Sequence, residues 1–432
     1  MTATELDDGA PAHAAPSPRR WWVLALCSAT IAGCYYEYDA IAPIADLLRA
    51  QRDFSQTQIG MLNAVFSLPN IVLALVGGLL IDRYGSARVA FWSAGLCFVG
   101  ALLTAVGNPY SLMVLGRLIF GVSDEALFIA LLAGLAQWFA AGGTAFAMAL
   151  FFSLARVGSY AADTSPGWAK ALYAHGWQPP LWFGAAIVGA GLIAAAAYRF
   201  GFPRPGAAPR AAGERIDWAD VWRFDRSFWF ILTLNVLFAS VFFPFRSTFA
   251  IEYFQDAKGL SLQQAGLANS WVFFAAIFAT PLFGFVADRL GHRALMMTVG
   301  TLLLPVTFLI LGTTHWSLWI STALMGISFS VVPAVIWPAT AMLVEPRRLG
   351  KAYGLINVLQ NIGLAVCNLV AGWLNDNAHA GRANPRGYDG MLWFFGVLGC
   401  LAFLSVVLLW RRESGPRGHG LESVRTTVTA ER

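Results

Sequence analysis

Residues 77–88 read GGLLIDRYGSAR, and residues 284–293 read GFVADRLGHR. Both stretches end an apolar run with an Asp-Arg pair, a glycine and a further arginine, and their Asp82 and Asp288 are 206 positions apart. Two pairs of glycines repeat at an offset of 205 positions: Gly121 with Gly326, and Gly158 with Gly363. A nearly constant offset over such long segments indicates that the chain consists of two halves that repeat each other.

The composition is typical of a membrane protein. Of the 432 residues, 57% are hydrophobic and 12% are charged, and the mean hydropathy is +0.60, whereas a soluble protein has about 25% charged residues. Apolar runs of about 20 residues recur along the chain, and a helix of that length crosses roughly 30 Å of hydrocarbon. We therefore expect an all-α protein that crosses the lipid bilayer several times.

Twelve membrane-spanning helices are predicted. They lie near 21–45, 59–81, 89–106, 111–138, 144–167, 180–199, 227–250, 266–287, 294–312, 316–344, 348–374 and 391–410. A polar stretch with three prolines and six arginines separates the sixth span from the seventh. The predicted organisation is a tail at 1–20, a six-helix bundle at 21–199, a linker at 200–226, a second six-helix bundle at 227–411 and a tail at 412–432.

The distribution of basic residues predicts the orientation in the membrane. They gather in the linker and on the same side of the spans, at Arg19, Arg20, Arg83, Arg88, Arg289, Arg293, Arg347, Arg348, Lys351, Arg411 and Arg412. Because cytoplasmic loops are enriched in Lys and Arg, we expect both termini to be cytoplasmic. The net charge of +5 then reflects topology and does not indicate nucleic acid. The abundance of Arg, Ala and Gly suggests a bacterial chain, and hence the inner membrane.

Other classes of function have little support in the sequence. The five cysteines all fall in apolar segments, where they predict neither an extracellular disulfide nor a metal site. Residues 1–18 are polar and precede Arg19, Arg20 and an apolar helix, which favours a signal anchor that stays as the first span over a cleaved signal peptide. No nucleophile–base constellation is present. We predict no enzyme activity and no cofactor, and a protein that acts as a monomer on a small-molecule substrate.

The Asp-Arg loop of each half resembles the signature loop of the major facilitator superfamily. That resemblance implies two pseudo-symmetric six-helix bundles with a substrate site between them, near the middle of the membrane. In the superfamily, charge contacts of this loop help to hold the outward-facing state. The residues to which the resemblance assigns this gating role are Asp82, Arg83, Arg88, Asp288, Arg289 and Arg293. The arginines also serve as topology determinants.

Motifs inside the spans are similar to those of one branch of the superfamily, the lysosomal dipeptide uniporters. They are Gly116–Leu127 (GRLIFGVSDEAL), Ser153–Ser159 (SLARVGS), Ile336–Pro338 (IWP), Leu349–Gly354 (LGKAYG) and Gln360–Ala365 (QNIGLA). The chain departs from the branch at Ala126, where the branch has Ser, and by the additional charges Glu37 and Arg246. These departures leave substrate range and coupling open.

Glu125 and Arg156 are the predicted substrate-binding charges. A charge near the middle of a spanning helix costs about 2.5 kcal/mol or more, so such residues face a cavity or a partner. A dipeptide is a zwitterion, and a carboxylate can bind its ammonium while a guanidinium binds both oxygens of its carboxylate. The resemblance implies these roles for Glu125 and Arg156. The alternative is an internal salt bridge that only fixes helix packing.

Further residues are expected around this pair. Asn361 occupies the repeat position of Arg156, Trp337 precedes Pro338 as a wall residue, and Tyr36 and Arg246 lie in the segments that depart from the branch. These four are predicted substrate contacts, although core packing is an equal alternative for Asn361.

Glu37 and Asp39 are candidates for proton coupling, since burial raises the proton affinity of a carboxylate. They can instead pair with Arg246 across the halves. Arg117 has a functional or a structural role, and Asp124 and Asp163 are expected to face water.

The prediction that follows is a secondary carrier of dipeptides or similar small zwitterions, either a uniporter or coupled to protons. A second possibility is a carrier of small organic anions, with Arg117, Arg156 and Arg246 as a clamp and Glu125 as a proton site. A membrane sensor or scaffold without transport is a third, which the short tails disfavour.

Overall fold

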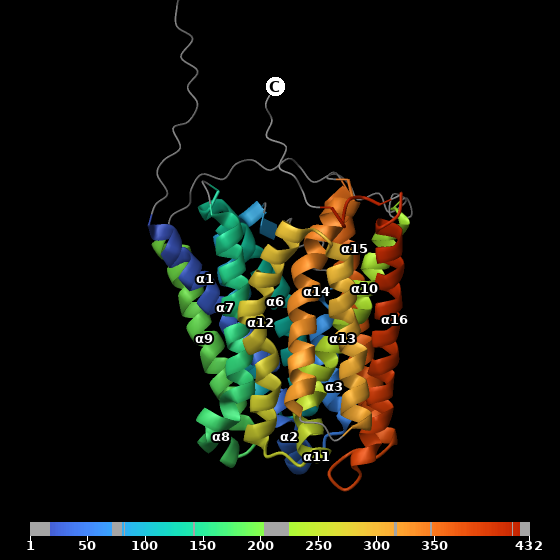
Figure 1. The fold of residues 1–432 in the computed structure, drawn as a ribbon. Coiled ribbons are helices and arrows are strands. Elements are labelled where there is room, and N and C mark those ends of the chain that lie inside the picture. Colours follow the sequence, from blue (N-terminus) through green and yellow to red (C-terminus); the bar gives the residue numbers. More distant parts are fainter. Residues whose placement is uncertain are drawn as a thin grey trace, which may run out of the picture.

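The computed structural model describes residues 18–70, 80–81, 83–140, 143–202, 224–314, 318–345, 348–416 and 418–423, without the side chains of residues 145 and 288. Helices make up almost all of this described chain, and the long ones run side by side in one bundle (Figure 1). Figure 1 also shows the two halves of the sequence on opposite sides of the bundle.

Each of the twelve predicted spans overlaps a helix. The helical segments of the first half are α1 (Arg19–Asp39), η1 (Ala42–Ile44), α2 (Ala45–Arg52), α3 (Gln56–Ser67), α5 (Ser86–Val106), α6 (Tyr110–Trp138), α7 (Thr144–Trp168), α8 (Lys170–Ala174) and α9 (Gln178–Gly201). Those of the second half are α10 (Arg226–Pro244), η3 (Phe245–Phe249), α11 (Ala250–Asp256), α12 (Leu262–Leu290), α13 (Arg293–Thr313), α14 (Leu318–Leu343), α15 (Leu349–Asn377), η5 (Pro385–Tyr388) and α16 (Asp389–Glu413). The all-α architecture of two six-helix bundles is as predicted.

Among the described residues, nine helical segments are long and apolar enough to cross a membrane. The three spans outside this group are α1, α3 and α7. The described part of α3 has only 12 residues. Both α1 and α7 contain charged residues within their length, including Glu37 and Arg156. The exceptions therefore all lie in the first half.

Two spans differ in length from the prediction. The first ends at Asp39, because the chain turns there into η1, with Pro43, and then into the short polar helix α2. The seventh continues past the predicted residue 250 to Asp256 through η3, a five-residue π-helix directly after Pro244. Proline removes a backbone donor from the ladder, and π-helical turns often occur at functional sites. This turn places Arg246 inside the bundle.

The repeated glycines make equivalent contacts in the two halves. A side chain on Gly158 of α7 would meet the Ala32 carbonyl of α1 at 1.9 Å, and one on Gly363 of α15 would meet Ser240 of α10 at 2.1 Å. The fifth and eleventh spans thus approach the first and seventh in the same way, since small residues allow close helix contact in membranes. The internal repeat seen in the sequence is a repeat of helix packing.

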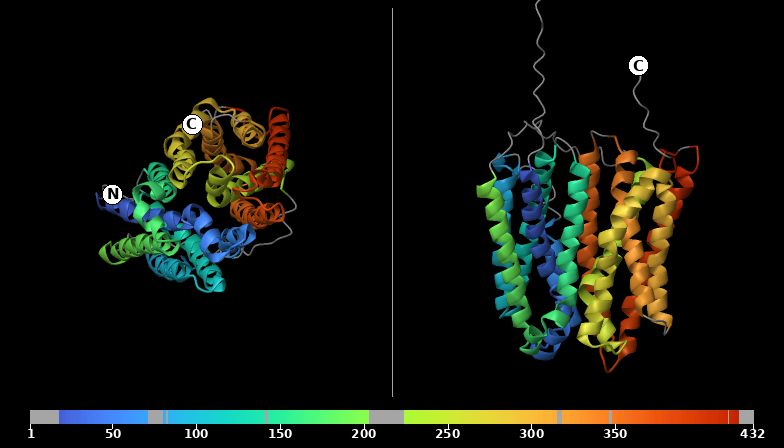
Figure 2. Two further views of the ribbon diagram at one scale, coloured as in Figure 1. Left: turned by 90° about the horizontal axis from the view of Figure 1, so that it is seen from below. Right: turned by 60° about the vertical axis from the view of Figure 1, so that its left-hand side comes forward.

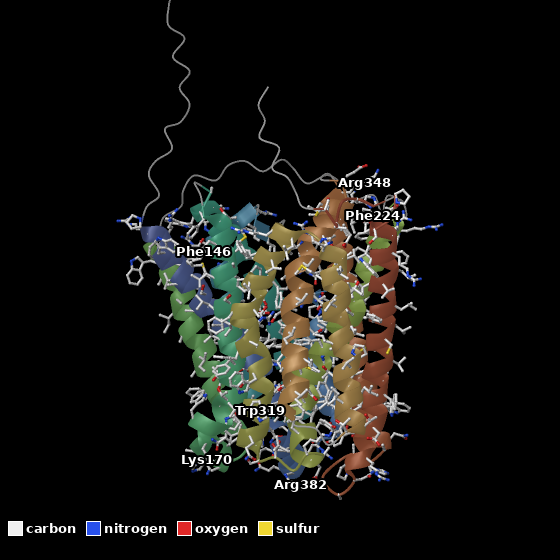
Figure 3. The ribbon with its side chains drawn as sticks, viewed as in Figure 1. Phe146, Lys170, Phe224, Trp319, Arg348 and Arg382 are labelled. Carbon is white, nitrogen blue, oxygen red and sulfur yellow. The ribbon has the colours of Figure 1, made fainter. Side chains whose placement is uncertain are left out.

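The bundle has two ends that differ in structure. We call the end at which α1 begins and α16 ends the terminal end, where Phe224 and Arg348 lie, and the opposite end, with Lys170 and Arg382, the distal end (Figure 3). Figure 2 shows the two halves as separate groups of helices, seen from the distal end and from the side.

Several polar contacts join the halves at the distal end. Arg49 of α2 forms an ion pair with Glu252, lies 3.6 Å from Asp256 and donates to the Ala380 carbonyl at 3.2 Å. Asp376 at the end of α15 accepts hydrogen bonds from the backbone N–H groups of Gln56 and Thr57 at the start of α3, at 2.7 and 2.8 Å. We call these residues the distal seal, and they hold the halves together at this end.

Candidate functional site

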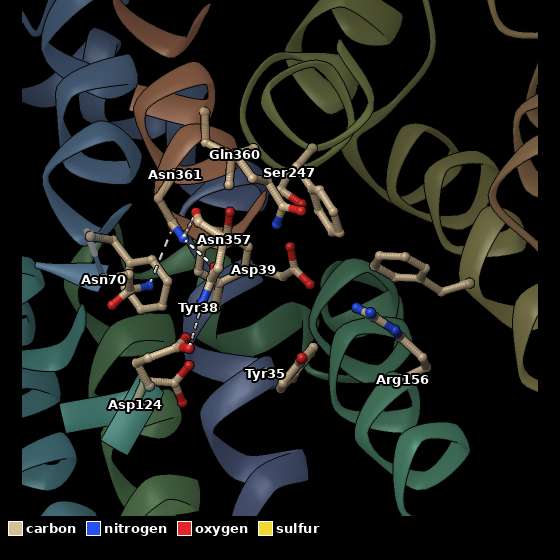
Figure 4. Close-up of a pocket in the computed structure, with 15 residues that line it drawn as sticks. Tyr35, Tyr38, Asp39, Asn70, Asp124, Arg156, Ser247, Asn357, Gln360 and Asn361 are labelled. Atoms are coloured by element: carbon tan, nitrogen blue, oxygen red, sulfur yellow. Dashed lines mark hydrogen bonds between the residues drawn. The ribbon is translucent and has the colours of Figure 1, made fainter. Parts of the chain in front are cut away.

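A polar cavity of about 150 Å³ lies between the two halves (Figure 4). A cavity needs about 10–15 Å³ of such space to hold one water molecule, so this cavity has room for several. Its lining comes from both halves: Tyr35, Tyr38, Asp39, Phe66, Asn70, Asp124, Glu125 and Arg156 from the first, and Phe243, Ser247, Phe273, Asn357, Gln360, Asn361 and Leu364 from the second.

Glu125 reaches the cavity from the middle of α6. Its Oε1 accepts a hydrogen bond from Asn357 Nδ2 of α15 at 3.0 Å. Asp124, the preceding residue, also lines the cavity, and its buried Oδ1 has no hydrogen-bond partner within the described part of the chain. The first half therefore presents two adjacent carboxylates to the cavity.

Arg156 reaches the cavity from α7. Its guanidinium carbon lies 4.9, 4.8 and 5.2 Å from the ring centres of Tyr35, Phe273 and Phe329. In the described part of the chain no carboxylate lies within 4.0 Å of it, so Arg156 and Glu125 border one cavity without forming an ion pair. Figure 4 shows Arg156 and Asp124 approaching the cavity from different sides. An opposite charge on each side of an empty space suits a ligand with both charges.

A chain of amide side chains crosses the site. Asn361 Nδ2 donates to Asn357 Oδ1 at 2.7 Å, and Asn70 Nδ2 of the first half donates to Asn361 Oδ1 at 3.4 Å. Gln360 accepts from Asn235 at 2.7 Å. Of this group, only Asn361 is a predicted substrate contact. The spacing of Asn357 and Asn361, four residues apart in an apolar span, places both on one helix face and could have revealed the second amide.

Arg246 lies beside the cavity in a buried ionic cluster. Its Nη1 is 2.7 Å from Asp39 Oδ1 of α1, and its Nη2 pairs with Asp163 of α7. Asn269 of α12 donates to Asp163 at 3.2 Å. The pairing of Asp39 with Arg246 is one of the two alternatives left open by the sequence. The expectation that Asp163 faces water is wrong, because its side chain is 0% exposed and opposite Arg246.

Glu37 and Tyr36 point elsewhere. Glu37 is 1% exposed, and neither of its carboxylate oxygens has a hydrogen-bond partner in the ranges that the structure describes. A side chain on Gly184 of α9 would meet its Oε2 at 2.2 Å. Tyr36 is buried against Phe183, while its neighbour Tyr35 lines the cavity. Neighbouring residues of α1 thus face different surroundings, and only Tyr35, Tyr38 and Asp39 of this segment border the cavity.

Trp337 borders a second cavity of about 330 Å³, which has Arg156 in its lining as well. The other lining residues on α7, among them Phe152 and Ser153, precede Arg156 and so lie nearer the terminal end. Arg156 therefore stands between the central cavity and a space on its terminal side.

The predicted gating residues that the structure describes lie at the terminal end. The acidic member Asp82 and the side chain of Asp288 are outside the described residues. Arg83 and Arg88 are exposed, Arg289 is exposed and lies over the Phe285 ring at 4.6 Å, and Arg293 is 4% exposed at the start of α13. Their gating role remains a prediction.

One group of side chains has the donor atoms of a metal site. Cys34, Cys97 and Asp124 place one ligand atom each within 4.8 Å of one another. Three donors are one fewer than the four of a structural zinc site.

Two pseudo-symmetric six-helix bundles around a polar cavity at their interface define a membrane transporter. The sequence matches the model of the Major Facilitator Superfamily over residues 23–253 and 228–430. The chain belongs to that superfamily.

Named relatives are similar over nearly the whole chain. The lysosomal dipeptide transporter MFSD1 of Homo sapiens is 30% identical over 94% of this chain and 91% of its own length, and that of Danio rerio is 30% identical over 88% and 84%. The probable sulfoacetate transporter SauU of Cupriavidus necator is 22% identical over 79% of this chain and 84% of its own length.

Among solved structures, the nucleoside transporter NupG (D323A mutant) aligns with a TM-score of 0.73 at 13% identity, covering 90% of this chain and 98% of its own. A bacterial homologue of the human lysosomal transporter Spinster, in an inward-facing and unoccupied conformation, aligns with a TM-score of 0.70 at 14% identity, over 91% and 98%. These structures support the fold.

Proposed function

We propose that this transporter moves dipeptides or similar small zwitterions across the membrane by alternating access. Glu125 binds the ammonium group of the substrate and Arg156 binds its carboxylate. The observation that supports this most is that both charges border one cavity and are not paired with each other. The dipeptide transporters among the relatives support the same substrate class.

The surroundings of the two charges favour a short peptide with varied side chains. Amide groups of Asn357 and Asn361 offer donors and acceptors to the peptide unit, and the rings of Tyr35 and Phe273 form an apolar wall beside Arg156. Ring faces tolerate different side chains, because dispersion contacts are not directional. Trp337 contacts substrate in the second cavity, on its path to the terminal end.

We also propose how the protein is oriented in the membrane and which conformational state of the transport cycle this structure represents. Both termini are cytoplasmic in a bacterial inner membrane, as the basic loops indicate, and the predicted arginines of the terminal end act with Asp82 and Asp288 as gates. Because the distal seal is formed, we assign this structure to the conformational state whose cavity opens toward the terminal end. The whole site lies within one chain, which is consistent with a monomer as the functional unit.

Uptake of radiolabelled alanyl-alanine into liposomes with the purified protein tests this function. Glu125→Gln and Arg156→Lys should each lower uptake at least about tenfold, which corresponds to about 1.4 kcal/mol. Glutamine keeps the shape of the glutamate side chain but has no negative charge, and lysine keeps the positive charge of arginine but not its planar guanidinium. Lys170→Arg, an exposed change at the distal end that keeps the charge, is the control for expression and folding. Wild-type rates in both variants would contradict the proposal.

A carrier of small organic anions is the alternative, favoured by the aromatic enclosure of Arg156 and by the sulfoacetate transporter among the relatives. The same variants separate the two. An anion carrier with Glu125 as its proton site keeps its substrate binding in Glu125→Gln and loses only pH dependence, whereas a dipeptide carrier loses binding.

A further inference from the structure

We propose that the cluster formed by Asp39, Arg246 and Asp163 binds one proton that moves with the substrate, so that this chain is a proton-coupled carrier. The inference rests on the proposed function, because it assigns coupling to the same transport cycle. It is carried by the geometry of the cluster, its charge and its position between the halves.

The cluster has one guanidinium for two carboxylates. Both carboxylates contact Arg246, and the three side chains are between 0% and 1% exposed. The neighbouring groups from α12 are neutral, namely the Asn269 amide and the Phe273 ring, whose centre lies 3.8 Å from the guanidinium carbon. With both carboxylates ionised, the cluster has a net charge of −1 in the membrane interior.

Among the described residues, no base other than Arg246 forms an ion pair with these two carboxylates. Arg156 lies over the same Phe273 ring and borders the cavity with Asp39, but it is more than 4.0 Å from both carboxylates. The ionisable groups that interact with the cluster from the surrounding helices are Tyr35 and Tyr38 on α1, Arg117 on α6 and Tyr173 on α8. The guanidinium of Arg117 donates to the backbone carbonyls of Glu37 and Tyr38, and the carboxylate with which it interacts most is that of Glu37. Arg117 and Glu37 thus balance each other in charge.

An uncompensated buried charge costs several kcal/mol. A proton on one carboxylate oxygen makes the cluster neutral, because it then contains one protonated aspartate, one ionised aspartate and one guanidinium. We infer that the distal end closes with this proton bound. No further reactant is needed, since the O–H bond forms with a proton from water on one side and breaks to water on the other.

The position of the cluster links this proton to both sides of the membrane. Asp39 lines the central cavity together with Glu125 and Arg156, so the proton can leave through the substrate path. Arg246 belongs to the second half, and both carboxylates belong to the first. Separation of the halves at the distal end would part the guanidinium from its partners and expose the two carboxylates to water there.

The test uses the full-length protein in liposomes, with alanyl-alanine as the probe and the membrane potential clamped to zero. Two readouts are compared: exchange of labelled for unlabelled dipeptide, which needs no net proton movement, and accumulation driven by a pH one unit higher inside. With one proton per dipeptide, the wild type should accumulate the probe up to tenfold, since one pH unit is a factor of ten.

The Asp163→Asn variant should exchange labelled for unlabelled dipeptide at the wild-type rate. Under the pH gradient, its internal dipeptide concentration should not rise above the external one. Asp39→Asn is the second variant, because either substitution leaves one carboxylate opposite one guanidinium, a neutral pair that needs no proton. Glu413→Gln is the control: a buried carboxylate at the terminal end of α16, outside the cluster, whose loss should leave tenfold accumulation intact.

Each outcome of these assays supports or contradicts one of the two proposals. Exchange without pH-driven accumulation in the wild type would overturn the inference and leave the proposed function standing, as would tenfold accumulation by Asp163→Asn or Asp39→Asn. Absence of exchange in the wild type would overturn the proposed function itself.

Discussion

Arg117 is a buried charge whose hydrogen-bond partners, among the residues that the structure describes, include no carboxylate. It is 0% exposed, and its guanidinium donates to the carbonyls of Leu62, Glu37 and Tyr38 at 3.3, 3.2 and 3.2 Å and to the side chain of Asn63. The two carbonyls of α1 belong to its last turn, where a positive charge interacts favourably with the helix dipole. These contacts support the structural role of Arg117 over the functional one.

Replacement of Arg117 should therefore destabilise the first half. Arg117→Met keeps the length of the side chain but leaves several buried acceptors unpaired, each at a cost of about 1–3 kcal/mol. We expect the free energy of unfolding in detergent to fall by about 3 kcal/mol or more. Arg83→Met, at an exposed position whose guanidinium lies over the Tyr84 ring, is the control. Equal stability of both variants would show that Arg117 does not hold α1 and α3.

At the scale of elements, α3 depends on a carboxylate from the other half. Ser55 caps this helix locally by accepting from Gln58, while Asp376 of α15 accepts from the next two backbone donors and from the Thr57 hydroxyl at 2.5 Å. Capping of a helix start contributes about 1 kcal/mol. Because the cap comes from α15, this energy is present only while the distal end is closed.

Asp376→Asn should shift the equilibrium toward opening at the distal end. A loss of about 1.4 kcal/mol changes the ratio of the two states about tenfold. The distance between spin labels at Lys170 and Ala383, one in each half at this end, should become longer in a larger fraction of molecules. Asp53→Asn, an exposed carboxylate of the same end, serves as the control, and an unchanged distance distribution in Asp376→Asn would contradict the role of the cap.

Sequence reasoning located the helices but not all of their partners. Apolar length and the repeated Asp-Arg loops predicted twelve spans in two bundles, and family motifs directed attention to Glu125 and Arg156. The burial of Asp163 was missed, because its partner Arg246 lies 83 positions away and enters the bundle through a π-turn. The acceptors of Arg117 are backbone carbonyls, which leave no mark in a sequence.

For the whole molecule, two halves with equivalent glycine contacts meet at a sealed distal end and share a cavity. Arg156, which has no ion pair among the described residues, lies on one side of this cavity and carboxylates lie on the other. Such an arrangement allows the halves to rock about a fixed site, as is general for transporters built from repeats. Substrate selection then depends on whether a solute presents both charges to Glu125 and Arg156.

The most direct measurement of this claim is uptake by the wild-type protein in liposomes of alanyl-alanine and of its two blocked forms, N-acetyl-alanyl-alanine and alanyl-alanine amide. The three solutes differ little in size, but the acetylated form has no ammonium for Glu125 and the amide has no carboxylate for Arg156. We predict uptake of the free dipeptide and a loss of at least about tenfold for each blocked form, since charge-assisted bonds contribute about 1.5–3 kcal/mol each. Uptake of either blocked form at the rate of the free dipeptide, or no uptake of any of them, would contradict the account.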